Sequence, residues 1–469
     1  MAFSHRFDPT TLREYDIRGT VGRTLSDADA FAIGRCFGSI VARQGGTTTA
    51  VGYDGRLSSP QLEEALVKGL TASGIVAVRI GRGPTPMLYY AATTLKTDGA
   101  VMVTGSHNPP DYNGFKMVLA GKPFFGEQIR ALGDQALAGD VVEESTAPRR
   151  NVDVSADYVA RLLSDWDGGD RLLKVVWDNG NGAAGEVLQR LVAGLPGEHV
   201  VLNGTIDGRF PAHHPDPTVP ANLQQLIAEV AARRADIGIA LDGDADRIGL
   251  VDDKGRILFG DQLMVLLARD VLRERPGATV IADVKASQVL FDEIARAGGN
   301  PLMWRTGHSL IKAKMAETGS PLAGEMSGHI FFADRWYGFD DALYASVRML
   351  GVLARLDTKL SKVRDALPQV INTPEVRFDC DDTRKFAVIE EVAERLRAEG
   401  AKVSETDGVR VLTDDGWWLL RASNTQAVLV ARAEAETEVG LERLKQALVK
   451  QLEQSGLPAP DFSGSHSGH

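Results

Sequence analysis

Apolar residues in this chain form short runs that alternate with longer amphipathic segments, and the alternation occurs three times. Each repeat opens with an apolar run that ends in aspartate, at residues 51–54, 175–178 and 280–283, followed by a loop and hydrophobic positions at helical spacing. A glycine, a second apolar run and a third run that ends in a polar loop complete each repeat. Strands alternating with helices predict sheets with helices packed on them, and such folds place ligands at the carboxyl ends of the strands.

The last part of the chain has a different rhythm. Beyond about residue 367 the pattern predicts a strand, a helix, further strands around Asp-Gly turns and a final helix from Glu436, which indicates a smaller α+β unit. We therefore expect the α/β class, with three similar mixed-sheet α/β domains and a smaller α+β C-terminal domain around a central cleft. A multidomain scaffold without chemistry is the alternative. The expected domains are 1–150, 151–254, 255–367 and 368–460, with 461–469 as a disordered tail.

Charge and cysteine content exclude several classes of function. The 469 residues include 52 Lys and Arg and 63 Asp and Glu, and the net charge of −11 argues against a nucleic-acid or anionic-membrane surface. Cys36 and Cys380 lie far apart, so we expect neither a disulfide framework nor a cysteine zinc site. Apolar runs fall short of the ~20 residues of a membrane span, and the amino terminus does not resemble a signal peptide. We expect a cytoplasmic monomer that binds neither nucleic acid nor membrane.

Three alternating aspartates form the first candidate site. Asp242, Asp244 and Asp246 follow an apolar strand, and alternate residues of an extended segment face the same way. Three such carboxylates repel one another unless a cation lies among them, and oxygen ligands without His or Cys favour Mg²⁺ over zinc. An EF-hand is excluded, because the sixth loop position is Arg247 and the twelfth is Asp253. The loop predicts a magnesium site, with a solvated acidic turn as the alternative.

Ser106 is the second candidate, in a loop that reads Gly-Ser-His-Asn-Pro-Pro. A Ser-His-Asp triad is not indicated, because the adjacent Ser106 and His107 are expected to point apart and no GxSxG elbow is present. A serine hydroxyl can instead accept and donate a phosphoryl group when a metal stabilises the transferred charge. A serine in a proline-rich turn is, however, more often only a turn residue.

Two further loops are suited to a sugar phosphate. Residues 421–425, Arg-Ala-Ser-Asn-Thr, combine a guanidinium group, hydroxyls and an amide, which is a suitable set for holding a phosphate. Glu325, Ser327 and His329 alternate as the aspartates do, and a carboxylate with a hydroxyl and an imidazole suits neighbouring sugar hydroxyls. The alternatives are a polar hairpin turn for the first loop and a buried structural network for the second.

The combined motifs resemble those of the α-D-phosphohexomutases, and in particular the bacterial phosphomannomutase/phosphoglucomutase branch. The resemblance covers the chain to about residue 460 and implies four domains around a cleft. It also implies an isomerase that interconverts hexose 1-phosphates and hexose 6-phosphates of glucose and mannose through a phosphoserine and a hexose 1,6-bisphosphate. The motifs are residues 15–19 (Tyr-Asp-Ile-Arg-Gly), 104–109 (Thr-Gly-Ser-His-Asn-Pro), 113–116 (Asn-Gly-Phe-Lys), 242–247, 324–329 and 421–425.

Carried over position by position, the resemblance implies a complete set of site residues. Ser106 would carry the phosphoryl group and, with Asp242, Asp244 and Asp246, hold Mg²⁺. Either His308 or His329 could accept the hydroxyl proton, and Arg18 and Lys116 would assist catalysis. The substrate-binding residues would be Tyr15, Arg247, Lys285, Glu325, Met326, Ser327, Gly328, Arg421, Ser423, Asn424 and Thr425.

The metal loop departs from the family pattern, and the motifs leave three alternative functions open. Ala245 replaces the usual second glycine of the metal loop, and we expect it to be tolerated only with a negative φ. Within the family, a phosphoglucosamine mutase is the alternative, although Met326 and the Ser-Asn-Thr sequence argue against it. A metal-dependent phosphatase with Asp242 as nucleophile and an inactive sugar-phosphate-binding protein are the alternatives of other classes.

Overall fold

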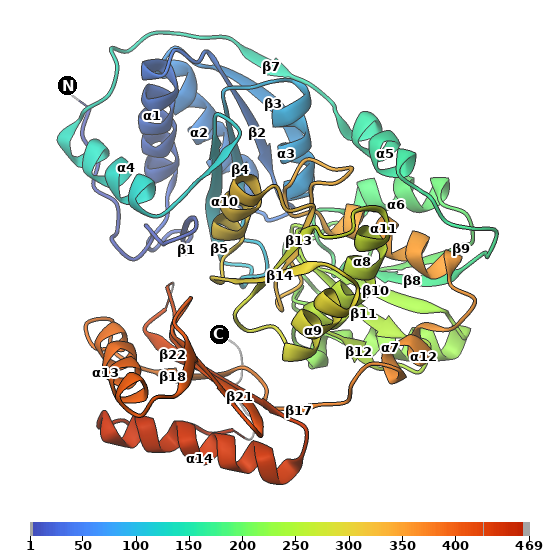
Figure 1. The fold of residues 1–469 in the computed structure, drawn as a ribbon. Helices are drawn as coiled ribbons and strands as arrows, with labels where there is room; N and C mark the ends of the chain where they lie inside the picture. Colours follow the sequence, from blue (N-terminus) through green and yellow to red (C-terminus); the bar gives the residue numbers. More distant parts are fainter. Residues whose placement is uncertain (1–2, 425, 463–469) are drawn as a thin grey trace.

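The computed structural model describes residues 3–424 and 426–462. Its first unit contains a seven-stranded sheet in the order β1-β5-β4-β2-β3-β7, with β6 paired to β5 (Figure 1). The central strands β2 and β4 are buried on both faces, because helices α1, α2 and α4 pack on one face of the sheet and α3 on the other. The elements are β1 (Ile17–Thr20), α1 (Asp27–Arg43), β2 (Thr48–Tyr53), α2 (Ser59–Ala72), β3 (Val76–Arg82), α3 (Thr85–Thr94), β4 (Gly99–Val103), β5 (Tyr112–Leu119), β6 (Lys122–Phe124), α4 (Glu127–Ala138) and β7 (Arg149–Asn151).

The second unit has a five-stranded sheet in the order β12-β11-β10-β8-β9. Strands β8, β9 and β10 are parallel, and β11 returns antiparallel to β10. β12 pairs with β11, so this sheet extends beyond the expected boundary at residue 254. The elements are α5 (Ser155–Ser164), β8 (Lys174–Asp178), α6 (Gly185–Gly194), β9 (Glu198–Leu202), the 3-10 helix η1 (Pro220–Leu223), α7 (Gln224–Arg233), β10 (Ile237–Leu241), β11 (Ile248–Asp252) and β12 (Ile257–Leu258).

The third unit repeats this arrangement with four strands in the order β14-β13-β15-β16. In each of the three units, one strand lies between two parallel neighbours; these central strands are β2, β8 and β13. One of the two neighbours carries the polar loop and is followed by an antiparallel strand. The three predicted loops are therefore equivalent hairpin connections, β4–β5, β10–β11 and β15–β16. The elements are α8 (Gly260–Glu274), β13 (Thr279–Asp283), α9 (Gln288–Arg296), β14 (Asn300–Trp304), α10 (His308–Thr318), β15 (Leu322–Gly324), β16 (Ile330–Phe332), α11 (Ala342–Arg355) and α12 (Leu360–Asp365).

The fourth unit is an antiparallel sheet in the order β17-β22-β21-β20-β19, with β18 paired to β22. Helices α13 and α14 pack on it, and the loop at residues 423–427 joins β21 to β22. This is the α+β unit expected from the sequence, so the predicted fold class is confirmed. The elements are β17 (Ile371–Asn372), β18 (Val376–Asp379), α13 (Lys385–Ala398), β19 (Lys402–Ser404), β20 (Val409–Thr413), β21 (Gly416–Ala422), β22 (Val428–Ala435) and α14 (Glu438–Gln454).

The first three domains share one hydrophobic core, whereas the fourth has its own. The shared core joins α3 of the first domain to α5 and α6 of the second and to α8 and α11 of the third. The core of the fourth domain lies within its own sheet and helices. Its apolar contact with the third domain is small and involves Val284, Trp417 and Leu419. The fourth domain, at the lower left of Figure 1, is thus joined to the rest mainly through polar contacts.

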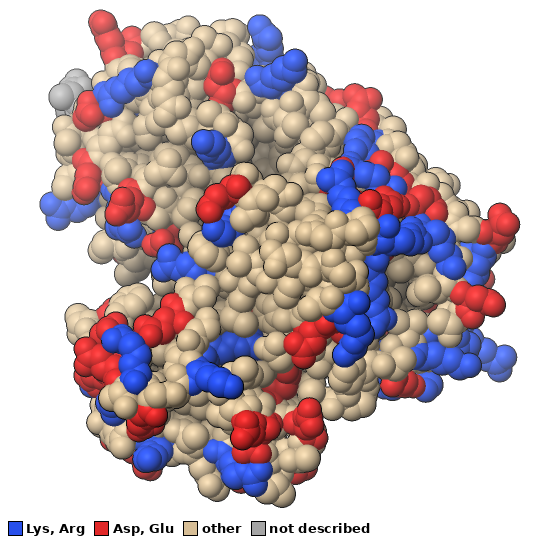
Figure 2. Space-filling view, viewed as in Figure 1, with Lys and Arg blue, Asp and Glu red and all other residues tan. Residues whose placement is uncertain are grey.

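Charge on the visible surface is mixed. Lys and Arg side chains are interspersed with Asp and Glu on the face shown in Figure 2. Within the described residues, no helix is both long enough and apolar enough to pass through a bilayer. With a net charge of −11, attraction for an anionic substrate must come from a local group of cations rather than from the surface as a whole.

Candidate active site

The loop that carries Ser106 meets the loop that carries the three aspartates. Ser106 is 2% exposed, and its Oγ donates a hydrogen bond to Asp242 Oδ2 at 3.0 Å. We expected Ser106 and His107 to point apart, and this is wrong: Ser106 Oγ lies 3.1 Å from His107 Nδ1. The left-handed backbone of Ser106, with φ +48°, brings the two neighbouring side chains together. The carboxylate bonds to the serine and not to the imidazole, so the arrangement differs from a Ser-His-Asp triad.

The three aspartates converge as the sequence predicts. Asp242, Asp244 and Asp246 are fully buried, and one oxygen from each lies within 4.8 Å of the others. Lys116 donates from Nζ to Asp244 Oδ2 at 2.8 Å and to Asp246 Oδ2. Burial, together with Asp246 and Asp244, raises the pKa of Asp242 well above its usual range.

A divalent cation fits this cluster. Asp244 Oδ1 and Asp246 Oδ1 are buried and have no hydrogen-bond partner among the described residues. Buried carboxylate oxygens are costly unless they are paired or bound to a metal, and an all-oxygen set suits a hard cation. The observed lysine neutralises only part of the charge of three carboxylates. The donor set and the two unpartnered oxygens therefore match a metal ligated by this loop.

The conformation of Ala245 differs from our expectation. We expected a negative φ, but Ala245 has φ +57° and is fully buried. The residue takes the left-handed conformation that a glycine would adopt more easily, at a cost of roughly 1–2 kcal/mol. Its methyl group packs in the core shared by the first three domains. This burial offsets part of the strain.

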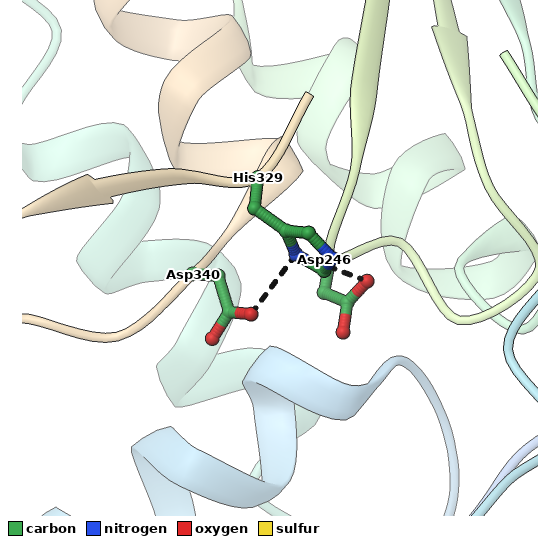
Figure 3. A group of neighbouring side chains, drawn as sticks. All are labelled: Asp246, His329 and Asp340. Carbon is green, nitrogen blue, oxygen red and sulfur yellow. Dashed lines mark ion pairs between the residues drawn. The ribbon is translucent and has the colours of Figure 1, made fainter. Parts of the chain in front are cut away.

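His329 lies between the carboxylates of Asp246 and Asp340 (Figure 3). Its Nδ1 is 3.0 Å from Asp340 Oδ2 and 3.6 Å from Asp246 Oδ1, and its Nε2 accepts a hydrogen bond from Arg247 Nε at 2.9 Å. Because Nε2 is the acceptor, the ring proton is placed on Nδ1, facing the carboxylates. Lys312, 2.9 Å from Asp340, and His329 hold the pKa of Asp340 well below its usual range, although burial acts in the opposite direction.

His308 is the neighbour of His329. Their rings stack with centroids 5.4 Å apart, and His308 Nδ1 is 3.8 Å from Asp340 Oδ2. Burial, reinforced by Lys312, lowers the pKa of His308 well below its usual range. The structure therefore places His329 beside Asp246 of the aspartate cluster, and His308 beside His329 and Asp340.

The predicted sugar loop turns beside the metal loop. Glu325 is 3% exposed and accepts a hydrogen bond from Gly307 N at 2.6 Å, and Met326 N donates to Asp283 Oδ1 at 3.1 Å. Gly328 has φ +90°, and a Cβ there would come within 2.4 Å of Ile248 O, so only glycine fits. Ser327 is half-buried in the same turn.

The phosphate loop of the fourth domain reaches the other domains. Asn424 Nδ2 donates to the hydroxyl of Tyr15 at 2.9 Å, and that hydroxyl donates to Thr306 O at 2.8 Å. Burial raises the pKa of Tyr15 to about 12. Ser423 Oγ accepts a hydrogen bond from the backbone of the same loop at 3.2 Å. Thr425, also predicted for this site, lies outside the described residues, as does the predicted tail from residue 463.

Two predicted cations at the edge of the site are paired with acids. Arg18 bonds to Asp16 and to Asn108 of the serine loop. Lys285 Nζ donates to Glu375 Oε2 at 2.9 Å, and so links the third domain to the fourth. The partners of Arg18 belong to the motifs at 15–19 and 104–109, whereas Glu375, the partner of Lys285, lies outside the motifs.

Comparison with known proteins places this geometry in a family. Four family models match in order: phosphoglucomutase/phosphomannomutase alpha/beta/alpha domain I at residues 9–141, domain II at 156–255, domain III at 259–371 and the C-terminal domain at 375–451. The chain belongs to the phosphoglucomutase/phosphomannomutase family. The predicted family and its class, isomerases that act as intramolecular phosphotransferases, are confirmed.

Members of this family are similar to the chain over nearly its whole length. A phosphomannomutase/phosphoglucomutase from Pseudomonas aeruginosa is 46% identical over 450 residues, which cover 96% of this chain and 97% of that protein. A phosphoglucomutase from Neisseria gonorrhoeae is 45% identical and covers 92% of this chain and 94% of its own. The crystal structure of a family protein from Burkholderia thailandensis is 44% identical, with a TM-score of 0.91 and coverage of 97% and 99%.

Two residues behind the serine loop were not predicted from the sequence. Arg56 is 1% exposed and donates to Ser106 O at 2.8 Å, Asn108 O at 2.6 Å and Tyr112 O at 3.0 Å. Asp54 accepts from Gly105 N at 3.0 Å and lies 3.2 Å from Arg56. The serine loop is thus held from behind by an ion pair. The Asp-Gly-Arg sequence gives no periodic signal, although a charged pair after an apolar strand could have drawn attention to it.

Proposed function

We propose that the protein interconverts hexose 1-phosphates and hexose 6-phosphates of glucose and mannose, with Ser106 as the residue that carries the phosphoryl group. The main support is that the hydroxyl of Ser106, on a strained turn, donates to one of three buried aspartates. Related proteins that are 46% and 45% identical are named phosphomannomutase/phosphoglucomutase and phosphoglucomutase. The four loops that support this reaction all come from one chain, so we propose that the protein acts as a monomer. Cys36 and Cys380 are free thiols, which supports our proposal that it acts in the reducing cytoplasm.

The proposed cation is Mg²⁺, held by Asp242, Asp244 and Asp246 with Ser106. When bound, it would neutralise negative charge on the transferred phosphoryl group. Lys116, 2.8 Å from Asp244, and Arg247, 2.9 Å from His329, place two further positive charges beside the aspartate cluster. Since phosphoryl transfer depends on positioning and on charge neutralisation, this concentration of cations is the main catalytic contribution of the chain.

The chemical step transfers the phosphoryl group from Ser106 to a free hydroxyl of the sugar. The bond between the serine oxygen and phosphorus breaks, and the sugar oxygen forms the new ester. The sugar proton moves to a base, and the serine oxygen takes up a proton to become the hydroxyl again. We propose His329 as that base: Nε2 would take the proton when the hydrogen bond from Arg247 Nε is released, and Asp340, 3.0 Å from Nδ1, would stabilise the charged ring. The resulting hexose 1,6-bisphosphate then reverses its orientation, and Ser106 takes back a phosphoryl group from the other end.

The remaining loops would hold the sugar in both orientations. Arg421, Ser423, Asn424 and Thr425 would bind the phosphate that is not reacting, and Glu325, with Ser327, would bind sugar hydroxyls. Glucose and mannose differ at carbon 2, so a site that binds the 3- and 4-hydroxyls accepts both sugars. Tyr15, Arg18, Lys285, Met326, Gly328 and His308 would complete the walls of the cleft.

The test is a mutase assay with glucose 1-phosphate and mannose 1-phosphate, primed with glucose 1,6-bisphosphate. We expect both 6-phosphates to form with the wild-type protein and Ser106→Ala to lose the activity while remaining folded. Ser346→Ala is the matched control, because Ser346 is also buried but, among the described residues, its hydroxyl bonds within helix α11, to Ala342 O at 2.6 Å. Full activity of Ser106→Ala would contradict the proposal.

The same assay separates the alternative functions. Faster turnover of glucosamine 6-phosphate than of either hexose phosphate would indicate a phosphoglucosamine mutase. Release of inorganic phosphate, with a hydroxylamine-labile phosphate on Asp242, would indicate a phosphatase. Binding of sugar phosphates without any turnover would indicate a binding protein.

A further inference from the structure

Asp407 lies at a turn between the phosphate loop and the third domain. It follows β19 and precedes Gly408, whose φ is +79° and where a Cβ would come within 2.3 Å of Leu420 O. The side chain of Asp407 is 9% exposed, and its Oδ2 accepts hydrogen bonds from Arg421 Nε at 2.9 Å and from Thr306 N at 3.1 Å. One carboxylate oxygen therefore joins the fourth domain to the third.

The bond to Nε fixes the orientation of the Arg421 guanidinium. Arg421 is 6% exposed, and a buried guanidinium needs a counter-charge. Although burial acts against the charge, Asp407 helps to keep the pKa of Arg421 above its usual value. With Nε engaged, recognition of a phosphate falls to the two terminal nitrogens, which can bind two oxygens at once.

The second bond places this arginine relative to the rest of the cleft. Thr306 precedes Gly307 and His308, and Gly307 N bonds to Glu325 at 2.6 Å. The carbonyl of Thr306 accepts from Tyr15, whose hydroxyl accepts from Asn424. Among the described residues, Asp407 and Tyr15 both link the 306–308 loop to the phosphate loop, and Asp407 is the charged one of these two.

We propose that Asp407 is a positioning residue, which orients Arg421 for the phosphate of the substrate and couples the fourth domain to the 306–308 loop. The proposal rests on the proposed function, in which Arg421 binds the phosphate that is not reacting. It adds a residue outside the loop motifs to the machinery that recognises the substrate.

The experiment compares Asp407→Ala, Asp407→Asn and Arg421→Ala with the wild-type protein, using glucose 1-phosphate as substrate. We expect Asp407→Ala to raise KM by roughly tenfold to a hundredfold, the effect of losing a charge-assisted hydrogen bond, with a smaller change in kcat. Asp407→Asn retains an oxygen that can accept one hydrogen bond, so it should recover part of the affinity. Hydrogen exchange should become faster in the peptide that contains Thr306, because its amide loses its acceptor.

Asp415→Ala is the matched control. Asp415 also precedes a glycine in a turn of the fourth domain and pairs with an arginine, Arg443, at 2.7 Å, but this pair is exposed and lies at the opposite end of the same hairpin. KM and the exchange of Thr306 should be unchanged in this variant.

The outcomes separate the inference from the function on which it rests. If Arg421→Ala raises KM but Asp407→Ala leaves both KM and the exchange of Thr306 as in the wild type, the inference about Asp407 is wrong. A loss of kcat alone with unchanged KM would also overturn it. If the wild-type protein lacks mutase activity, the proposed function itself fails.

Discussion

Removing Lys116 should make the protein depend on the cation for stability. The ammonium group lies between Asp244 and Asp246, its side chain is 5% exposed, and both carboxylates are fully buried. Lys116→Met leaves these carboxylates without their counter-charge, and breaking a buried pair in this way costs about 3–5 kcal/mol. At roughly 2–4 °C per kcal/mol for domains of this size, the melting temperature without metal should fall by roughly 6–20 °C.

Magnesium should recover much of this loss. A cation at about 100 times its Kd stabilises its site by ~2.7 kcal/mol, and in the wild-type protein Lys116 already supplies part of that charge. The Mg²⁺-dependent rise in melting temperature, measured by calorimetry in EDTA and in Mg²⁺, should therefore be larger in Lys116→Met than in the wild type. Lys312→Met is the control, because it removes a lysine paired with a different buried aspartate, Asp340. Equal Mg²⁺ shifts in all three proteins would refute this reasoning.

Three further substitutions give separate tests. Burial raises the pKa of Asp341 to about 7, so the contribution of this carboxyl group to stability falls as the pH rises from about 4 to about 7. Asp341→Asn should therefore be more stable than the wild type at pH 8, by roughly 1–3 kcal/mol. Equal melting curves of the two proteins from pH 5 to 9 would contradict this. Glu325→Ala should weaken turnover of glucose and mannose phosphates alike, and the account of recognition fails if both rates and both KM values stay normal. Ala245→Gly relieves ~1–2 kcal/mol of backbone strain, but it loses ~0.8 kcal/mol of methyl burial and gives the unfolded chain more entropy. The free energy of unfolding, measured by thermal melting, should therefore change by less than about 1 kcal/mol. A loss of stability above about 2 kcal/mol would show that Ala245 is not strained.

The repeat in the sequence predicted the fold because each repeat has the same local order of strands. Hydrophobic runs at 51–54, 175–178 and 280–283 correspond to β2, β8 and β13, which occupy the same place in the three sheets. The placement of the loops could be predicted for the same reason: each follows a buried strand, and alternate residues share a side. Local pattern was sufficient wherever the interacting groups lay on one segment.

Residues whose partners lie on another segment of the chain could not be predicted. Arg56, Asp340 and Asp407 lie in turns without periodicity, and their partners, Ser106, His329 and Arg421, are 50, 11 and 14 positions away in the chain. The two wrong expectations have a backbone cause, since both Ser106 and Ala245 take left-handed conformations that side-chain pattern does not reveal. Such conformations are strained and are maintained only by the surrounding tertiary structure.

The most direct measurement locates the transferred phosphate. The protein is incubated with glucose 1,6-bisphosphate labelled in its phosphate, digested and analysed by mass spectrometry, with a chase of unlabelled glucose 1-phosphate. We predict acid-stable label on the peptide that contains Ser106, and loss of that label to the sugar at the rate of turnover. Label on any other residue, or label on Ser106 that the sugar does not remove, would contradict the account.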